Sequence, residues 1–524
     1  MGLFMVVIIV VVIAVIVLIA IIKNGLMKNY LFNQYQIGIV GVDHELTKEY
    51  MQLNQEKAID EATFDDCEMN LVLNKINHTI SEIGNEYLYS RFFKNKNDFK
   101  MQEIIIENLN DEEKLKNALY ILNRLNKEYI PILSIKLKLL KYPFKFKYLF
   151  ISLLIINILS IIYTIFNLDF FYIPLLLSII CILLTFQFNG KYEQLGLQVG
   201  SIKGMLSASE KLMKNDLFPK EQHASINQAI HSLKSMIRVI YYFNMIESVD
   251  FIGISSLIRS IFLVDVIQTA CLQKHIDVIE NNVITLYEWI GLLDTCITIK
   301  LIRSLYDTCI PEVTDEKMIE IVNGYHILID KPVKNSFVLN NNTIITGSNA
   351  SGKSTFLKML GANLLLSKAL NTSFSEKFVY YPYELITSIH MKDDLQNGYS
   401  FYVQEIRRLN EITDLAKNKC SLILIDEILK GTNEKERLVI ANAILKYLFK
   451  QNAMTIVSTH DITLAYNFAN ADKYCFNDLK KNNDIVFDYL IKEGICTVGN
   501  AVAIVKSLSF DHEIIEDIDI EKSE

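Results

Sequence analysis

The sequence predicts an α/β domain with a buried parallel sheet at the C-terminal end of the chain, preceded by an all-α helical region and three transmembrane helices. Three observations in the 524 residues lead to this prediction. Short β-branched runs alternate with helical patterns after Pro311, a glycine-rich loop joins one such run to a helix, and three long apolar runs occur earlier. We expect an N-terminal anchor at 1–23, a mostly helical segment at 24–147, a transmembrane hairpin at 148–188, a helical region at 189–310 and the α/β domain at 311–524.

The first apolar run, Leu3–Ile22, is unbroken and long enough to cross a bilayer as a helix. A cleaved signal peptide is the competing interpretation. It is disfavoured because no basic residue precedes the run and Lys23-Asn24 stands where small residues would mark a cleavage site. We therefore interpret the run as an uncleaved membrane anchor.

Two further apolar runs, Tyr148–Phe166 and Phe170–Phe188, are separated only by residues 167–169, which predicts a transmembrane hairpin. A buried helical pair in a soluble core is the alternative. Lysines follow the first run and flank both ends of the hairpin, whereas residues 167–169 contain none. By the positive-inside rule the 167–169 turn then lies outside a multi-pass cell membrane protein, and the α/β domain is cytoplasmic. The lysines that carry this argument are Lys23, Lys28, Lys141, Lys145, Lys147 and Lys191.

Composition alone excludes few classes of function. Apolar residues make up 51% of the chain, which the membrane runs explain, and the net charge of −8 gives no overall attraction to nucleic acid. Eight cysteines without a C-x-x-C pair indicate reduced, scattered thiols. Helical spacing of Leu115, Leu119, Leu122 and Leu125 predicts an amphipathic helix over Asp111–Tyr129. Further helices are expected at Gln194–Lys214, His223–Met245 and within 251–306.

The glycine-rich loop has the pattern G-x-x-x-x-G-K-[ST] between an apolar β-branched run and an apolar-periodic helix. In that setting the backbone N–H groups and the helix N-terminus bind phosphate, whereas a chance match would be an ordinary turn. We expect Lys353 to reach the β- and γ-phosphates of ATP, and the Ser354 hydroxyl to ligate Mg²⁺. The expected nucleotide-binding residues of this loop are Gly347, Asn349, Ser351, Gly352, Lys353, Ser354 and Thr355.

Two later runs bring polar residues to the same expected sheet edge. Cys420–Glu427 is a continuous apolar run that ends in two carboxylates, as in a strand buried on both faces. We expect Asp426 to hold Mg²⁺ and Glu427 to polarise the attacking water. The run Met454–His460 ends in a histidine, either a structural residue or a sensor of the γ-phosphate. Four shorter strands are expected at Met318–Val322, Tyr325–Ile329, Ser336–Leu339 and Thr343–Thr346.

Several motifs in one order make the segment from about Glu312 to Asp517 similar to the ATPase domain of the MutS proteins, the mismatch-repair relatives of ABC-type ATPases. The P-loop pattern of that family, T-G-P-N-x-x-G-K-S-T, is matched except that Ser348 replaces proline. The resemblance covers about two-fifths of the chain. The matching elements are Thr346–Thr355, Asp393–Leu395, Ser400–Glu405, Asp426–Thr432, Thr459–His460 and Gly494–Ala503.

The resemblance implies a P-loop ATPase whose active unit is a homodimer with shared sites. Ser400 stands at the place of the signature serine, which reaches the γ-phosphate of the partner subunit, and Asn335 matches a neighbour of the base. The F-x-E wedge that reads mismatches in the family is not found. Three functions therefore compete: a membrane-tethered ATPase that moves helices on DNA, a membrane-side switch without DNA, and a transporter. The transporter is disfavoured because three spans are few and L-S-G-G-Q is not found.

Overall fold

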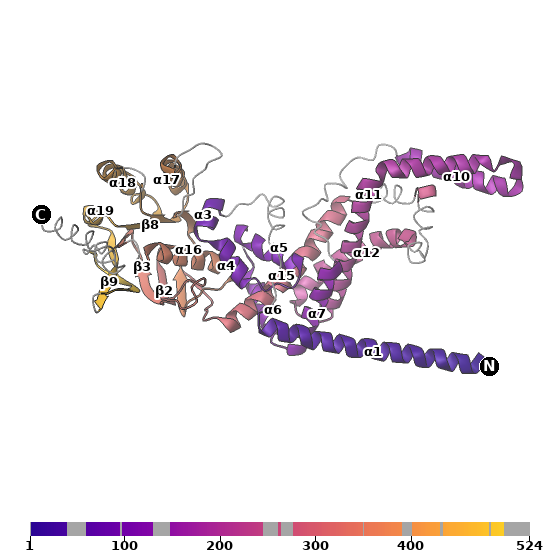
Figure 1. Ribbon diagram of the computed structural model, residues 1–524, viewed down its shortest axis with the longest axis horizontal. Coiled ribbons are helices and arrows are strands. Elements are labelled where there is room, and N and C mark those ends of the chain that lie inside the picture. The colour runs from indigo at the N-terminus through magenta and orange to yellow at the C-terminus, as the bar shows by residue number, and fades with distance from the viewer. Residues whose placement is uncertain are drawn as a thin grey trace, which may run out of the picture. The chain divides into compact units, whose positions relative to one another are not determined.

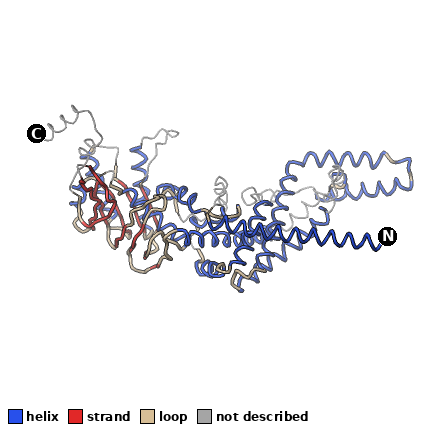
Figure 2. The backbone as a smooth tube through the Cα atoms, turned by 60° about the horizontal axis from the view of Figure 1, so that its bottom comes forward, coloured by secondary structure: helices blue, strands red, loops and turns tan. Residues whose placement is uncertain are grey.

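The computed structural model describes residues 2–38, 59–94, 97–128, 147–244, 260–263, 276–348, 351–389, 401–429, 433–481 and 484–496. The chain divides into two compact units. The helical unit lies within residues 1–54, 77–90 and 100–301, and the sheet unit within 55–76, 91–99 and 302–524. Figure 2 shows that the described strands belong to the sheet unit. The sheet unit therefore includes residues 55–76 and 91–99. The sequence predicts both of these stretches as parts of one helical segment at 24–147.

The helical unit has an apolar core to which all of its described α-helices except α10 contribute (Figure 1). Leu115, Leu119, Leu122 and Leu125 all lie in this core, as their helical spacing predicts. Its helices are α1 (Gly2–Gln36), α5 (Glu82–Ser90), α6 (Phe99–Asn108), α7 (Glu112–Glu128), α10 (Lys147–Phe166), α11 (Tyr172–Met213) and α12 (Lys220–Asn244), with most of α15 (Ile276–Leu305).

Among the described residues, two stretches are long and apolar enough to cross a membrane, Tyr148–Phe166 and Leu168–Thr185. They correspond to the expected hairpin, with the short 3-10 helix η2 (Leu168–Phe170) between them. The expected third span, Leu3–Ile22, is not among these candidates, although it is helical within α1. The expected helix at Gln194–Lys214 is not a separate element, because α11 continues from the hairpin to Met213 without a break.

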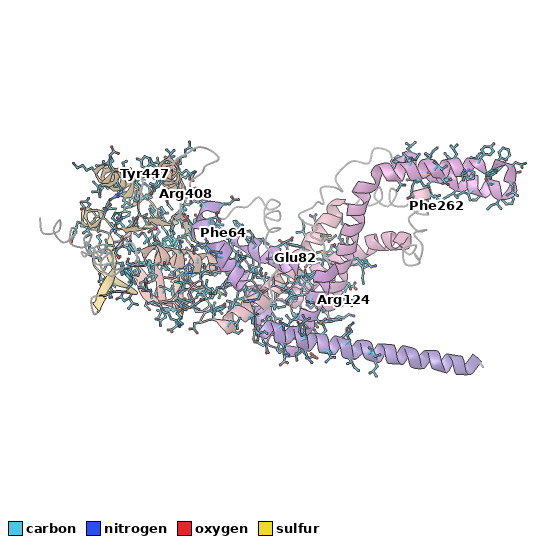
Figure 3. The ribbon with its side chains drawn as sticks, in the orientation of Figure 1. Phe64, Glu82, Arg124, Phe262, Arg408 and Tyr447 are labelled. Carbon is cyan, nitrogen blue, oxygen red and sulfur yellow. The ribbon has the colours of Figure 1, made fainter. Side chains whose placement is uncertain are left out.

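Two polar side chains of the hairpin, Asn157 and Thr185, are buried, while many of its apolar side chains are exposed. Asn157 is fully buried, and its Nδ2 donates to the Ile261 carbonyl oxygen at 3.1 Å. Thr185 donates to the Ser260 carbonyl oxygen at 3.4 Å. Phe262, labelled in Figure 3, belongs to this short stretch of 260–263 beside the hairpin.

The main sheet of the sheet unit has the described strand order β10-β9-β4-β8-β7-β6. Its strands pair in parallel except for β10, which pairs with β9 in antiparallel fashion. Burial on both faces fits the continuous apolar runs of β4, β7 and β8. The strands are β4 (Thr343–Gly347), β6 (Glu384–Ser388), β7 (Ser421–Asp426), β8 (Ala453–Thr459), β9 (Asp472–Lys481) and β10 (Asp484–Glu493).

A second sheet has the described order β1-β5-β2-β3. Its strands are β1 (Glu312–Val313), β2 (Ile319–Gly324), β3 (Asn335–Leu339) and β5 (Lys377–Tyr380). The prediction of a strand at Tyr325–Ile329 is wrong, because this stretch turns, with the Ile329 amide donating to the His326 carbonyl at 3.1 Å. Tyr325 and Ile327 are buried although the stretch belongs to neither described sheet, and this is why the sequence pattern misleads.

Helices complete the sheet unit, as expected for an α/β fold. The helix after the glycine-rich loop is α16 (Lys353–Leu370), and two others are α17 (Phe401–Asn418) and α18 (Glu434–Leu448). The short elements are α19 (Ile462–Asn467) and, from the N-terminal segments, α3 (Glu61–Asp66), α4 (Met69–Ile76) and the 3-10 helix η1 (Arg91–Phe93).

Candidate nucleotide-binding site

The loop between β4 and α16 turns sharply at two glycines. Gly347 has φ of 152° and Gly352 has φ of 103°, a region that residues with side chains rarely adopt. A Cβ atom at Gly347 would lie 2.8 Å from Ser351 Oγ and 2.9 Å from the Phe476 carbonyl oxygen. The tight turn therefore requires glycine at position 347, which is the role that the sequence pattern predicts.

Lys353, the first residue of α16, spans the mouth of this loop. Its side chain is buried, and Nζ donates to the Gly347 carbonyl at 2.8 Å and to the Ser348 carbonyl at 2.7 Å. Ser351 Oγ donates to the Ser348 carbonyl at 2.7 Å, which fixes the other side of the loop. The ammonium is thus held where a phosphate on the loop would meet it. Asn349 lies outside the described residues.

A hydroxyl and a carboxylate meet beside the loop. Ser354 Oγ donates to Asp426 Oδ2 at 2.7 Å, and Ser458 Oγ donates to Asp426 Oδ1. Hard divalent cations such as Mg²⁺ prefer oxygen ligands of this kind. The pair formed by Ser354 and Asp426 therefore fits the metal that the sequence predicts, with Ser458 orienting the carboxylate.

Glu427 and His460 lie together at the ends of β7 and β8. Glu427 Oε1 lies 3.2 Å from His460 Nδ1, and the Glu427 amide donates to the Ser458 carbonyl at 3.0 Å. Glu427 has φ of 55°, so a non-glycine residue with a left-handed backbone presents this carboxylate. The side chain of His460 is 43% exposed and that of Glu427 only 16%. A histidine that is accessible beside a shielded carboxylate can contact a substrate as well as the carboxylate.

A cavity of about 360 Å³ opens next to Gly352 and Thr355. Burial lowers the pKa of His326, one of its lining residues, from 6.5 to about 4, so its imidazole is neutral near pH 7. The other described lining residues are mainly apolar or aromatic: Gly324, Tyr325, Ile329, Lys331, Pro332, Val333, Asn335, Phe356, Met359, Phe476 and Tyr489. An apolar cavity beside a phosphate-binding loop has the character of a site for a nucleotide base.

Asn335 lines this cavity, but its amide is used by the neighbouring strand. Its Nδ2 donates to the Tyr489 carbonyl at 3.0 Å, and its Oδ1 accepts from the Ile491 amide at 2.8 Å. These bonds hold the irregular stretch of β10 between Phe487 and Ile491. Tyr489 in this stretch has φ of 53°, and its ring lies 3.1 Å from where a Cβ atom on Gly352 would be. Asn335 therefore positions Tyr489 over the loop.

Comparison with known proteins matches the same part of the chain. A family model described as MutS domain V covers residues 343–523, from the first residue of β4 onward. It includes the loop, Asp426, Glu427 and His460. This part of the chain is a MutS domain V.

The MutS relatives are similar to this chain over part of their length. The human protein named MutS protein homolog 4 is 28% identical over 228 residues, which are 40% of this chain and 24% of that protein. A protein of Carboxydothermus hydrogenoformans named DNA mismatch repair protein MutS is 28% identical over 248 residues, 43% of this chain and 29% of its own. The protein of the same name in Streptococcus pyogenes serotype M1 is 25% identical over 264 residues, which are 48% of this chain and 31% of that protein. The match thus spans 24–31% of the length of these relatives.

Within this MutS domain V the structure brings together most of the residues singled out from the motifs. Lys353, Ser354, Asp426, Glu427 and His460 meet at the carboxyl ends of β4, β7 and β8. Ser400 lies outside the described residues. Sequence reasoning missed the cavity residues His326 and Tyr489. The sequence signal for Tyr489 is weak, because one tyrosine in a strand gives no hint of a left-handed backbone.

Proposed function

We propose that this MutS-family chain is a membrane-anchored ATPase that binds Mg²⁺-ATP on the glycine-rich loop and hydrolyses its γ-phosphate. One observation carries the proposal. The Lys353 ammonium, the Ser354–Asp426 pair and the Glu427–His460 pair lie at one sheet edge, with the apolar cavity beside them. A base in the cavity and phosphates on the loop would place the γ-phosphate toward Glu427 and His460.

The side chains then divide the reaction between them. Gly347 and Gly352 shape the loop whose amides bind the phosphates, and Lys353 neutralises charge on their oxygens. Glu427 accepts a hydrogen bond from the attacking water, and His460 contacts the γ-phosphate while it remains paired with Glu427. Mg²⁺, held by Ser354 and Asp426, would neutralise charge on the phosphate oxygens.

Steady-state hydrolysis by the purified full chain tests this proposal. Lys353→Ala should abolish hydrolysis and weaken nucleotide binding, because the loop loses its buried cation. Glu427→Gln should bind ATP normally and hydrolyse it at least 100-fold more slowly, a loss on the order of 3 kcal/mol. Lys417→Ala, which removes a half-exposed lysine of α17, is the matched control. Hydrolysis by Glu427→Gln near the wild-type rate would contradict the role of Glu427.

The membrane part of the proposal rests on the hairpin of α10 and α11. Ile155, Leu159, Leu175 and Leu183 are each at least half exposed, which suits lipid better than water. We further propose that α1 supplies a third span and that the sheet unit faces the cytoplasm, where ATP is found. The arguments for these two points are the apolar run of Leu3–Ile22 and the distribution of lysines.

For the partners, we propose a homodimer in which Ser400 of each chain completes the ATP site of the other, by analogy with the MutS family. DNA as a ligand has the same support, since the relatives carry the name of DNA mismatch repair proteins. The alternative is an ATP-driven switch at the membrane that does not recognise mismatches. It is favoured because the F-x-E wedge that reads mismatches is not found in the sequence and the net charge is −8.

Duplex binding over a salt series separates these two functions. We expect weak binding that falls steeply with salt, because the net charge of −8 offers little to neutralise phosphates. Binding should not distinguish mismatched from paired DNA, because the F-x-E wedge is not found. The mismatched and the paired duplex should be compared at the same salt concentration. Lys353→Ala provides a protein whose nucleotide site is altered while its other surfaces are unchanged. Preference for a mismatch at physiological salt would support the repair function.

A further inference from the structure

The N-terminal helix α3 closes one edge of the main sheet. The edge strand β6 would otherwise present unpaired backbone groups. Instead the Thr387 amide donates to Thr63 Oγ1 at 3.1 Å, and the Ile389 amide donates to Asp66 Oδ2 at 2.8 Å. The Thr387 hydroxyl donates to the same Asp66 oxygen at 2.7 Å. Side chains of α3 thus replace a neighbouring strand, although more than 300 residues separate them from β6 in the sequence.

Arg408 of α17 joins this helix to the strand. It is 8% exposed, its Nε donates to the Thr387 carbonyl at 2.9 Å, and its Nη2 donates to Asp60 at 3.0 Å and to Thr63 at 3.2 Å. Asp60 also caps α3, since its Oδ1 accepts from the Thr63 amide at 2.7 Å. Figure 3 labels Arg408 and, on α3, the buried Phe64. One buried guanidinium therefore fixes α3, β6 and α17 relative to one another.

The preceding turn of α17 holds the loop that carries Glu427. Glu405 lies three residues before Arg408 and is 4% exposed, and its Oε1 accepts from the Leu429 amide at 2.6 Å. Glu427 and Leu429 have φ of 55° and 61°, values that cost free energy in residues with a side chain. This backbone therefore needs support from outside the loop, and Glu405 provides one such support.

The same N-terminal segment contacts the helix behind the glycine-rich loop. Glu68 pairs with Lys358 of α16 at 2.7 Å, and Cys67 packs so closely that a Cβ atom on Gly361 would lie 2.5 Å from its sulfur. Residues 60–68 thus touch β6 and two helices beside the site. These are α16, which follows the glycine-rich loop, and α17, whose Glu405 holds the loop of Glu427.

We propose that Asp66, with Thr387 and Arg408, is a positioning residue for hydrolysis: it sets α17, and through Glu405 the loop that presents Glu427. The proposal rests on the proposed ATPase function and adds a role for the N-terminal segment in it. None of the three residues is among the described residues that line the cavity. Loss of their contacts should therefore slow hydrolysis and leave nucleotide binding intact.

A matched pair at Thr387 tests the contact in the full chain. Thr387→Val keeps the shape of the side chain and removes the hydroxyl that donates to Asp66, whereas Thr387→Ser keeps the hydroxyl. We expect Thr387→Val and Asp66→Asn to lower kcat by about tenfold, with KM and the affinity for a fluorescent ATP analogue within about twofold of wild type. Thr387→Ser should retain kcat. Glu411→Gln, which removes an exposed partner of Arg408, should leave every value unchanged.

Hydrogen exchange gives a second readout that does not depend on hydrolysis. Asp66→Asn and Glu405→Gln should each increase exchange in the peptide that covers 421–429, while peptides of β4 and α16 exchange as in wild type. Equal kcat in Thr387→Val and Thr387→Ser would overturn the proposal, and so would increased exchange throughout the sheet unit, which is the result of a merely structural role. A wild-type chain that does not hydrolyse ATP would refute the proposed function, and exchange in 421–429 would still decide the positioning role.

Discussion

The buried imidazole of His326 should make the stability of the sheet unit depend on acid. His326 is 5% exposed, and burial lowers its pKa from 6.5 to about 4. Among the charged groups around it, Glu68 favours the imidazolium, while Lys358 and Lys75 oppose it. Its Nδ1 accepts from the Leu328 amide at 3.3 Å, which also requires the neutral ring.

The sign and size of the effect follow from proton linkage. A histidine whose folded pKa is depressed takes up a proton in the unfolded chain first, so the unfolding free energy falls as the pH drops from 6.5 toward 4. Between pH 7.5 and pH 5, a folded pKa of about 4 gives a loss of about 2 kcal/mol from this residue. This loss is a large fraction of the unfolding free energy of a typical protein domain, which is about 5–15 kcal/mol.

Pulse proteolysis in urea can measure this loss, with fragments of the sheet unit identified by mass. His326→Gln is the informative variant, because its amide oxygen can accept from Leu328 and it does not titrate. The variant should lose about 2 kcal/mol less than wild type between the two pH values. Equal pH dependence in both proteins would refute the reasoning, whereas equal stability at pH 7.5 is not required.

Three further predictions concern the loop, the membrane topology and the assembly. Gly347→Ala should abolish nucleotide binding, because its Cβ would meet the Phe476 carbonyl, whereas Gly25→Ala on α1 meets no atom within 4 Å and should bind normally; titration with a fluorescent ATP analogue compares them. A cysteine introduced at Leu168 should react with an impermeant reagent in intact cells, and labelling at Tyr30 instead would reverse the topology. Lys353→Ala and Ser400→Arg chains should each be inactive but recover about a quarter of wild-type hydrolysis when co-expressed, and full activity of Ser400→Arg alone would exclude shared sites.

Much of the sheet unit could be predicted because its physics is local in the sequence. A strand buried on both faces must be apolar throughout, and β7 and β8 are recognisable for that reason. Parallel strands bring their carboxyl ends to one edge, so the ends of these runs predict the meeting of Asp426, Glu427 and His460. The glycines of the loop follow from backbone conformation alone.

The remaining features depend on contacts between distant residues, and the sequence carries little signal for them. The stretch Tyr325–Ile329 has the composition of a strand, yet it turns and lines the cavity. Asn335 lines the cavity, and the sequence gives no sign that its amide also holds β10. Acidic residues around Asp60 and Asp66 look like a solvated face, whereas Asp66 is buried against Thr387. Periodicity identifies which side of a helix is apolar, and it does not identify which polar side chain pairs across 300 residues.

The closure of β6 by α3 has a consequence for how the sheet unit can vary. Removing the N-terminal segment would leave the amides of Thr387 and Ile389 without their acceptors and Arg408 without Asp60 and Thr63, and buried polar groups that lose partners cost on the order of 1–3 kcal/mol each. The sheet unit is therefore incomplete in the stretch that matches MutS domain V, because one edge of its sheet is supplied from residues 60–66. From α4 the chain continues at Asn77 into the helical unit. The segment that completes the sheet is thus also one of the covalent links between the sheet unit and the unit that contains the hairpin of α10 and α11.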